Sequence, residues 1–205
     1  SLVFYILIKG IPNLKPSLFE WKYTSKNASM MPAIINTITM VLMTLLIAVP
    51  FGIGSAIYLT EYAKRGNKVV PVIRMTTETL SGIPSIVYGL FGYMAFVRWL
   101  DWGYSLMAGI ITLAIMILPL IMRTTEEALL AVPDSYREGS YGLGAGRLRT
   151  IFRVVLPSAM PGILSGVILG VGRIVGETAA LIYTAGSVTG VPDSLMSSGR
   201  TLAVH

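Results

Sequence analysis

The sequence predicts an all-α membrane protein that crosses the bilayer several times. Hydrophobic residues make up 54% of its 205 residues and charged residues only 13%, roughly half the charged share of a soluble domain. Charge is also absent from four long stretches, which lie between Lys26 and Glu61, Glu78 and Arg98, Asp101 and Arg123, and Arg153 and Arg173. A helix needs about 20 mainly apolar residues to span a bilayer, and each stretch is long enough or nearly so.

The chain opens on a short apolar run, residues 2–8, followed by a polar segment from about Gly10 to Ser29. The run is too short to span the membrane. It has neither a basic start nor a small-residue cleavage site, so it fits a signal peptide poorly, and the end of a helix is the better interpretation. The polar segment contains Pro12 and Pro16, which predicts an irregular loop outside the membrane.

Four complete spans are predicted after this loop. They run from about 32 to 58, 72 to 96, 105 to 122 and 160 to 184. Trp99 and Trp102 follow the second span and suit the membrane interface. Within that span Pro84 lacks an amide hydrogen and glycines flank it, so either a break or an ordinary kink is expected there.

The basic residues indicate how the chain is oriented in the membrane. The link 61–74 carries four lysines and arginines and the stretch 123–157 carries five, whereas 98–102 and 186–205 carry one each. The positive-inside rule therefore puts 61–74 and 123–157 in the cytoplasm, although four lysines before residue 27 count against it. The net charge of +6 is attributed to these membrane-flanking residues rather than to nucleic-acid binding.

The stretch 123–157 contains a predicted short helix, about residues 136–143. Ser135 and Glu138 have the S-x-x-E spacing of a capping box, in which both side chains satisfy free amides at a helix start. Pro133 stops any preceding helix. Gly144 and Gly146 supply positions that tolerate a left-handed helix end.

The residues of this segment resemble the EAA loop of ABC-importer permeases. Glu138-Gly139-Ser140, then Gly144, then Val154-x-Leu156-Pro157 match its spacing, with Gly139 and Ser140 in place of two alanines, which weakens the helix slightly. In that family the helix docks into a groove of the ATPase subunit and transmits its closure. The resemblance implies a coupling role for Ser135, Tyr136, Arg137, Glu138, Gly139, Ser140, Gly144, Leu156 and Pro157. From the residues alone, an ordinary amphipathic interfacial helix is the alternative.

The fourth span holds two charges, Arg173 and Glu177, and a charge at mid-membrane costs at least about 2.5–3.5 kcal/mol. At about 100° per residue, one arc of about 80° collects Gly162, Gly166, Gly170, Arg173, Glu177, Ala180 and Thr184. Two interpretations of this face stay open and are compatible. One is a helix-packing face of three glycines with an internal Arg–Glu pair; the other is a translocation pathway lined by a cation and an anion.

Two further segments resemble phosphate permeases. Residues 173–181 resemble their R-x-x-G-E-T-A segment, and residues 82–92 resemble a second hallmark. The continuation through residue 185 favours the PstA-type subunit over its PstC-type companion. The resemblance, over about residues 30–190, implies a MetI-like helical core and puts Arg173, Glu177 and Thr178 along the substrate pathway. There Arg173 would offset the charge of phosphate.

The same resemblance implies the other components of a transporter. These are a separate ATP-binding cassette ATPase, a second, PstC-like permease and an extracytoplasmic phosphate-binding protein, in the plasma membrane of a prokaryote. The chain is expected to be one permease domain, 1–205, with a partial first helix, a coupling loop at 123–157 and no last helix. A permease for another oxyanion, such as molybdate or sulfate, remains an alternative. So does an ion-coupled transporter or channel, although the EAA-like loop argues against it.

No catalytic residue, cofactor or metal site is predicted. Cysteine is absent, and the glycines around 142–146 lack the Lys-Ser/Thr that completes a phosphate-binding loop. Glu126 and Glu127 are interpreted as a solvated pair at a helix end, and Arg74 is expected to pair with Glu78 near the membrane surface.

Overall fold

The computed structural model describes residues 2–11, 16–21, 23–24, 28–63 and 66–205, and every regular element within these ranges is a helix. Three helices are long and apolar enough to cross a membrane: Met31–Tyr62, Leu106–Leu130 and Arg147–Val175. A bent pair, Val69–Ser81 and Ser85–Trp99, makes a fourth span if it is counted as one. The predicted class, an all-α polytopic membrane protein, is confirmed.

The elements follow one another with short connections. In chain order they are α1 (Leu2–Gly10), the 3₁₀ turn η2 (Pro16–Phe19), α2 (Met31–Ile57) with the π-helical turn η3 (Tyr58–Tyr62), α3 (Val69–Ser81), α4 (Ser85–Gly92) with the π-helical turn η4 (Tyr93–Trp99), α5 (Leu106–Leu130), α6 (Asp134–Gly142), α7 (Arg147–Thr150), the π-helical turn η5 (Ile151–Val155), α8 (Leu156–Val175) and α9 (Ala179–Thr184).

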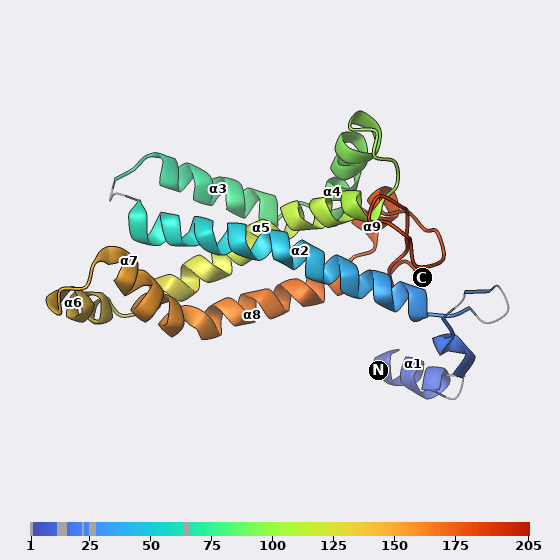
Figure 1. The fold of residues 1–205 in the computed structure, drawn as a ribbon, viewed down its shortest axis with the longest axis horizontal. Coiled ribbons are helices and arrows are strands. Elements are labelled where there is room, and N and C mark those ends of the chain that lie inside the picture. The colour runs from blue at the N-terminus through green and yellow to red at the C-terminus, as the bar shows by residue number, and fades with distance from the viewer. Residues whose placement is uncertain (1, 12–15, 22, 25–27, 64–65) are drawn as a thin grey trace.

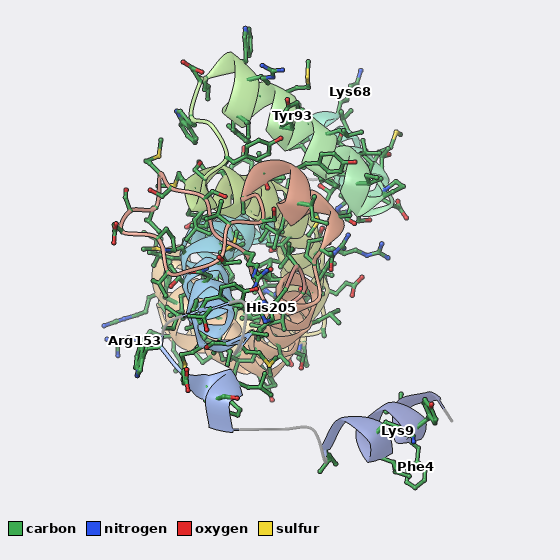
Figure 2. The ribbon with its side chains drawn as sticks, turned by 90° about the vertical axis from the view of Figure 1, so that its right-hand side faces the viewer. Phe4, Lys9, Lys68, Tyr93, Arg153 and His205 are labelled. Carbon is green, nitrogen blue, oxygen red and sulfur yellow. The ribbon has the colours of Figure 1, made fainter. Side chains whose placement is uncertain are left out.

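Helix α5 is the central helix of a bundle in which α2 and α8 run alongside it (Figure 1). Two thirds of its most apolar window is buried, 67% against 28% for the other two long helices, and Leu113, Ile117 and Ile121 are enclosed in the core. We call the end with α6 and α7 the inner end, and the end with α9 and the C-terminal residues the outer end. Helix α1 stands apart from the bundle in both views (Figures 1 and 2).

The predicted second span is broken. Helix α3 ends at Ser81, α4 begins at Ser85, and the chain bends by 99° between them. Pro84 has extended backbone angles, φ −59° and ψ 141°, and a proline cannot donate the hydrogen bond that would continue the helix. The hydroxyl of Tyr88 instead donates to the carbonyl of Leu80 at 2.8 Å across the break. Of the two expected outcomes, the break is the one found.

The third span is longer than predicted, because α5 runs on to Leu130 instead of ending near residue 122. Charged side chains compensate one another along this extension. Arg123 pairs with Glu127 at 3.0 Å, and Glu126 pairs with Arg74 at 2.5 Å. The predicted Arg74–Glu78 pair is therefore wrong, because Arg74 pairs with Glu126. The predicted solvated pair is correct for Glu127, whose side chain is 63% exposed, and wrong for Glu126, which is 12% exposed and turned toward another helix.

The capping box predicted for α6 is also wrong. The helix begins at Asp134 after the extended residue Pro133, and no side chain caps it. Ser135 therefore lies inside the first turn, where its hydroxyl is not placed to act as the N-cap. At the other end Gly144 has φ +79°, as predicted for a left-handed helix end. Gly146 has φ −72°, so its predicted left-handed conformation is not found.

The last twenty residues, 186–205, form an irregular cover over the outer end, which we call the cap (Figure 1). The side-chain amide of Asn36 in α2 donates to the carbonyls of Gly190 and Arg200, both at 3.0 Å. The N–H of Leu202 donates to the hydroxyl of Thr37, also at 3.0 Å. His205 lies near the middle of this end of the bundle (Figure 2). The tail is thus polar and irregular, as predicted, but it is fastened to α2.

Candidate functional site

A helix break lies in the middle of the charged segment. Helix α8 ends at Val175 and α9 begins at Ala179. Glu177 is 7% exposed, and its Oε1 accepts the N–H of Ala180 at 3.0 Å, so it satisfies a free amide in the first turn of α9. The predicted continuous span to residue 184, and with it the single arc from Gly162 to Thr184, is therefore wrong beyond Arg173.

Arg173 lies in the last turn of α8 and is partly buried. Among the described residues it makes no hydrogen bond or ion pair, so the predicted Arg173–Glu177 pair is not found. Its charge lies at the negative end of the α8 dipole, which favours a cation, and within electrostatic range of the Tyr88 hydroxyl. Thr178 donates its hydroxyl hydrogen to the carbonyl of Ala203 in the cap at 3.3 Å.

The two segments that resemble phosphate permeases lie against each other. Helix α4 packs on α9, and a Cβ atom added at Gly89 would come within 2.8 Å of the Cα of Ala180. At Gly92 an added Cβ would come within 2.8 Å of a methyl of Thr184. Because both positions leave no room for a side chain, segments about 90 residues apart in sequence form one packed unit next to Arg173.

The three glycines of α8 face α5. An added Cβ would lie 2.7 Å from the Cβ of Ala128 at Gly162, and 3.1 Å from the Cδ1 of Ile117 at Gly170. At Gly166 it would overlap the side chain of Thr124. These glycines therefore let α8 approach α5 closely within this chain.

At the inner end, α6 has two different faces. Tyr136, Glu138 and Leu143 are exposed, Leu143 to 91%, and Ser135, Gly139, Gly144 and Pro157 are exposed as well. Ser140 turns inward, and its hydroxyl lies 2.8 Å from that of the fully buried Thr150. The serine in place of alanine thus gains a link to α7. Leu156 packs against the buried cluster that includes Leu129 and Val155.

Arg137 is the most highly bonded side chain of α6. Its Nε and Nη2 donate to Oε1 of Glu61 at 3.1 and 2.7 Å. It also donates to the carbonyls of Leu129 and Val132 at 2.9 and 2.8 Å. Glu61 and Arg137 are 7% and 15% exposed, so this ion pair is largely buried. Nη1 of Arg137 also donates to Oδ1 of the exposed Asp134 at 3.2 Å, so the guanidinium is well satisfied by hydrogen bonds.

Glu61, Tyr62 and Arg147 form a part of the inner end that the sequence did not indicate. Arg147 donates to the carbonyl of Glu61, and its guanidinium carbon lies 4.9 Å from the centre of the Tyr62 ring, within the range of a cation–π contact. The available signal was a single carboxylate that ends a long uncharged stretch. Its partner Arg137 lies 76 residues further on, too far for spacing to join the two.

The chain belongs to the family described as the binding-protein-dependent transport system inner membrane component, which matches residues 48–203. A solved structure of the MetNI methionine ABC transporter shares the fold, with a TM-score of 0.61 over 91% of this chain and 79% of that one, at 19% identity. The predicted permease fold is thus confirmed.

Curated relatives narrow the resemblance further. The chain is 36% identical to the "Probable ABC transporter permease protein YqgI" of Bacillus subtilis, over 100% of this chain and 74% of that protein. It is 37% identical to the "Phosphate transport system permease protein PstA 2" of Mycobacterium bovis, over 88% and 61%. It is 39% identical to the "Phosphate transport system permease protein PstA" of Pasteurella multocida, over 90% and 66%. The chain spans less than two thirds of the length of the last two relatives. Their identities of 37% and 39% confirm the predicted resemblance to PstA-type permeases.

Proposed function

We propose that this chain is a membrane-spanning permease subunit of an ATP-driven importer, and that it translocates inorganic phosphate delivered by an extracytoplasmic binding protein. The observation that carries the proposal is Arg173, a partly buried cation without an ion pair among the described residues, beside the packed unit of α4 and α9. The names of two of the three relatives quoted above, which include phosphate transport, support this substrate.

Phosphate needs charge compensation when it leaves water, and a guanidinium provides charge together with paired N–H donors. Because Arg173 has no carboxylate partner in the described chain, an entering anion would not have to break an ion pair. Glu177, whose carboxylate is held by the amide of Ala180, would limit how tightly the anion is held. Weak binding suits a transporter, which must also release its substrate.

The partners proposed for the chain follow from its inner end. The exposed face of α6, with Tyr136, Glu138 and Leu143, would dock on a separate ATPase subunit, where ATP is hydrolysed. This chain would contribute no catalytic residue. A second, PstC-like permease would complete the pathway in the inner membrane of a prokaryote, and the binding protein would deliver phosphate at the outer end.

The test is uptake of labelled phosphate by the assembled transporter. Arg173→Gln should lower ATP-dependent uptake at least about tenfold, the equivalent of 1.4 kcal/mol, while the ATPase subunit still co-purifies. The matched control is Arg123→Gln, which removes an exposed arginine paired with Glu127 and should leave uptake unchanged. Uptake that survives in Arg173→Gln would remove this residue from the pathway. Competition by excess sulfate or molybdate would assign the chain to another oxyanion.

A further inference from the structure

The inner end of α2 is held by two arginines from the segment that carries α6. Arg137 donates two N–H groups to the carboxylate of Glu61. Arg147 donates to the carbonyl of the same residue and makes a cation–π contact with the ring of Tyr62. We call this arrangement the Glu61 clamp. In the described part of the chain, hydrogen bonds and an ion pair join α6 and α7 to α2 and η3, and all of them are made to Glu61.

The clamp also fixes α6 relative to α5. The link between these helices is only residues 131–133, and a short turn of this kind can absorb a small rotation. Arg137, however, bonds the carbonyls of Leu129 and Val132 as well as Glu61. One guanidinium therefore holds the end of α5, the turn and the end of α2 together, so that a displacement of α6 moves all three.

Helix α2 leads from this clamp to the opposite end of the molecule. With η3 it runs unbroken from Met31 to Tyr62, 32 residues, or about 48 Å at 1.5 Å per residue. That exceeds the roughly 30 Å hydrocarbon core of a bilayer. Its outer turns carry Asn36 and Thr37, which hold the cap at Gly190, Arg200 and Leu202.

The cap in turn touches the charged segment. The carbonyl of Ala203 accepts the hydroxyl of Thr178, the residue before α9 and five positions after Arg173. A chain of hydrogen-bonded contacts therefore runs from α6 through Glu61, along α2, through Asn36 and Thr37, and into the cap next to the break between α8 and α9.

We propose that Glu61 and Asn36 are positioning residues for coupled transport: the Glu61 clamp fastens α2 to α6, so that a displacement of α6 moves α2 and, through Asn36, the cap. This inference rests on the proposed function only in that α6 docks on an ATPase, and it is independent of the substrate. Helix α2 contains Pro50, which removes one backbone hydrogen bond, but the helix packs along α5 and is fastened at both ends. A helix held in this way can carry a displacement across the membrane, and the experiment below tests whether the cap has two states that respond to ATP.

The experiment measures movement of the cap directly. These 205 residues contain no cysteine, so Met196→Cys, at a position 47% exposed in the cap, introduces one thiol among them for maleimide labelling, and any cysteine elsewhere in the full-length protein is replaced first. In the full-length transporter, assembled with cysteine-free partners, the labelling rate is measured with and without ATP. We expect ATP to change the rate at least about threefold, as a shift between two populated states would.

The variants Glu61→Gln and Asn36→Ala should each abolish the ATP response while the ATPase subunit still co-purifies. Glu127→Gln, which breaks an exposed ion pair near the same end, should keep it. An ATP response retained in Glu61→Gln, or absent from the reporter protein itself, would overturn the proposal. If Glu61→Gln fails to assemble, Arg137→Lys takes its place. Failure of both to assemble would assign the clamp to folding and overturn its role in coupling. If the transporter proves to import another oxyanion, the proposed substrate is wrong, but the labelling experiment still tests the coupling proposal.

Discussion

Acidic and basic side chains inside this bundle are arranged differently at its inner and outer ends. At the inner end, Glu61 and Arg137 lie within 2.7 Å of each other, and the guanidinium also bonds two backbone carbonyls. At the outer end, Arg173 has no carboxylate partner in the described residues, and Oε1 of Glu177 accepts a hydrogen bond from the amide of Ala180. The same two residue types are thus paired at one end and separated at the other.

This comparison distinguishes a charge that stabilises the fold from a charge that is available to bind an anion. A buried ion pair with all its hydrogen bonds made is expensive to break, because removing one partner strands the other. A cation without a partner costs free energy in the isolated chain and can recover it when an anion or another subunit arrives. The pairing, rather than the residue type, separates the structural charge at the inner end from the candidate substrate site at the outer end.

The largest expected effect is on the inner pair. Glu61→Ala should lower the free energy of unfolding by about 3 kcal/mol, because it leaves the largely buried guanidinium of Arg137 with only the exposed carboxylate of Asp134 as a counter-charge. Thermal unfolding in detergent measures this. The control Glu127→Ala removes one member of an exposed pair and should cost no more than about 1 kcal/mol. Equal effects of the two variants would show that the inner pair is no more structural than a surface pair.

A smaller effect is expected where α4 meets α9. Gly89→Ala should cost about 1–3 kcal/mol, because its Cβ would lie 2.8 Å from the backbone of Ala180. Gly54→Ala is the matched control: it is also inside an apolar helix, but no atom lies within 4 Å of the added Cβ. It should be neutral or stabilising by up to about 1 kcal/mol. Indistinguishable unfolding temperatures would contradict the close packing of the two segments.

The smallest effect on stability is expected at Arg173. Arg173→Gln should change the free energy of unfolding by no more than about 1 kcal/mol, since the lost interaction with the α8 dipole is offset by removal of a partly buried charge that has no ion pair in the described residues. The same purified variant that is tested for uptake can be used for thermal unfolding. A loss as large as that of Glu61→Ala would mean that Arg173 has a structural partner, and the contrast between the two ends would disappear.

Apolar length and local chemistry predicted most elements but not where they end. The spans around 32–58 and 105–122 were found because uncharged stretches are long, yet α5 continues to Leu130. Its extra turns are charged: Arg123 and Glu127 pair with each other within α5, and Glu126 pairs with Arg74 of another helix. The spacing of Ser135 and Glu138 suggested a capping box, but the helix starts after Pro133, two residues earlier than predicted. Neither a partner on another helix nor a backbone angle is visible in spacing.

The candidate site could likewise be predicted only in part. Arg173, Glu177 and the segment around Pro84 could be singled out from the sequence, because charge and proline inside apolar spans are costly. The sequence could not show that a break at Gly176–Thr178 directs Glu177 to the amide of Ala180 and leaves Arg173 without an ion pair. Nor could it show the Glu61 clamp, whose members are 76 residues apart.

Bilayer thickness fixes the length of apolar runs and short motifs have local spacing, so the amino-acid pattern was enough to predict a multi-span helical protein of the importer-permease type. The folded chain was needed to show which charges are paired, that the two motif segments pack through Gly89 and Ala180, and that α2 joins Glu61 at one end to the cap at the other. These depend on contacts between distant parts of the chain. Such contacts are set by how side chains fill the space between helices, and no local pattern encodes them.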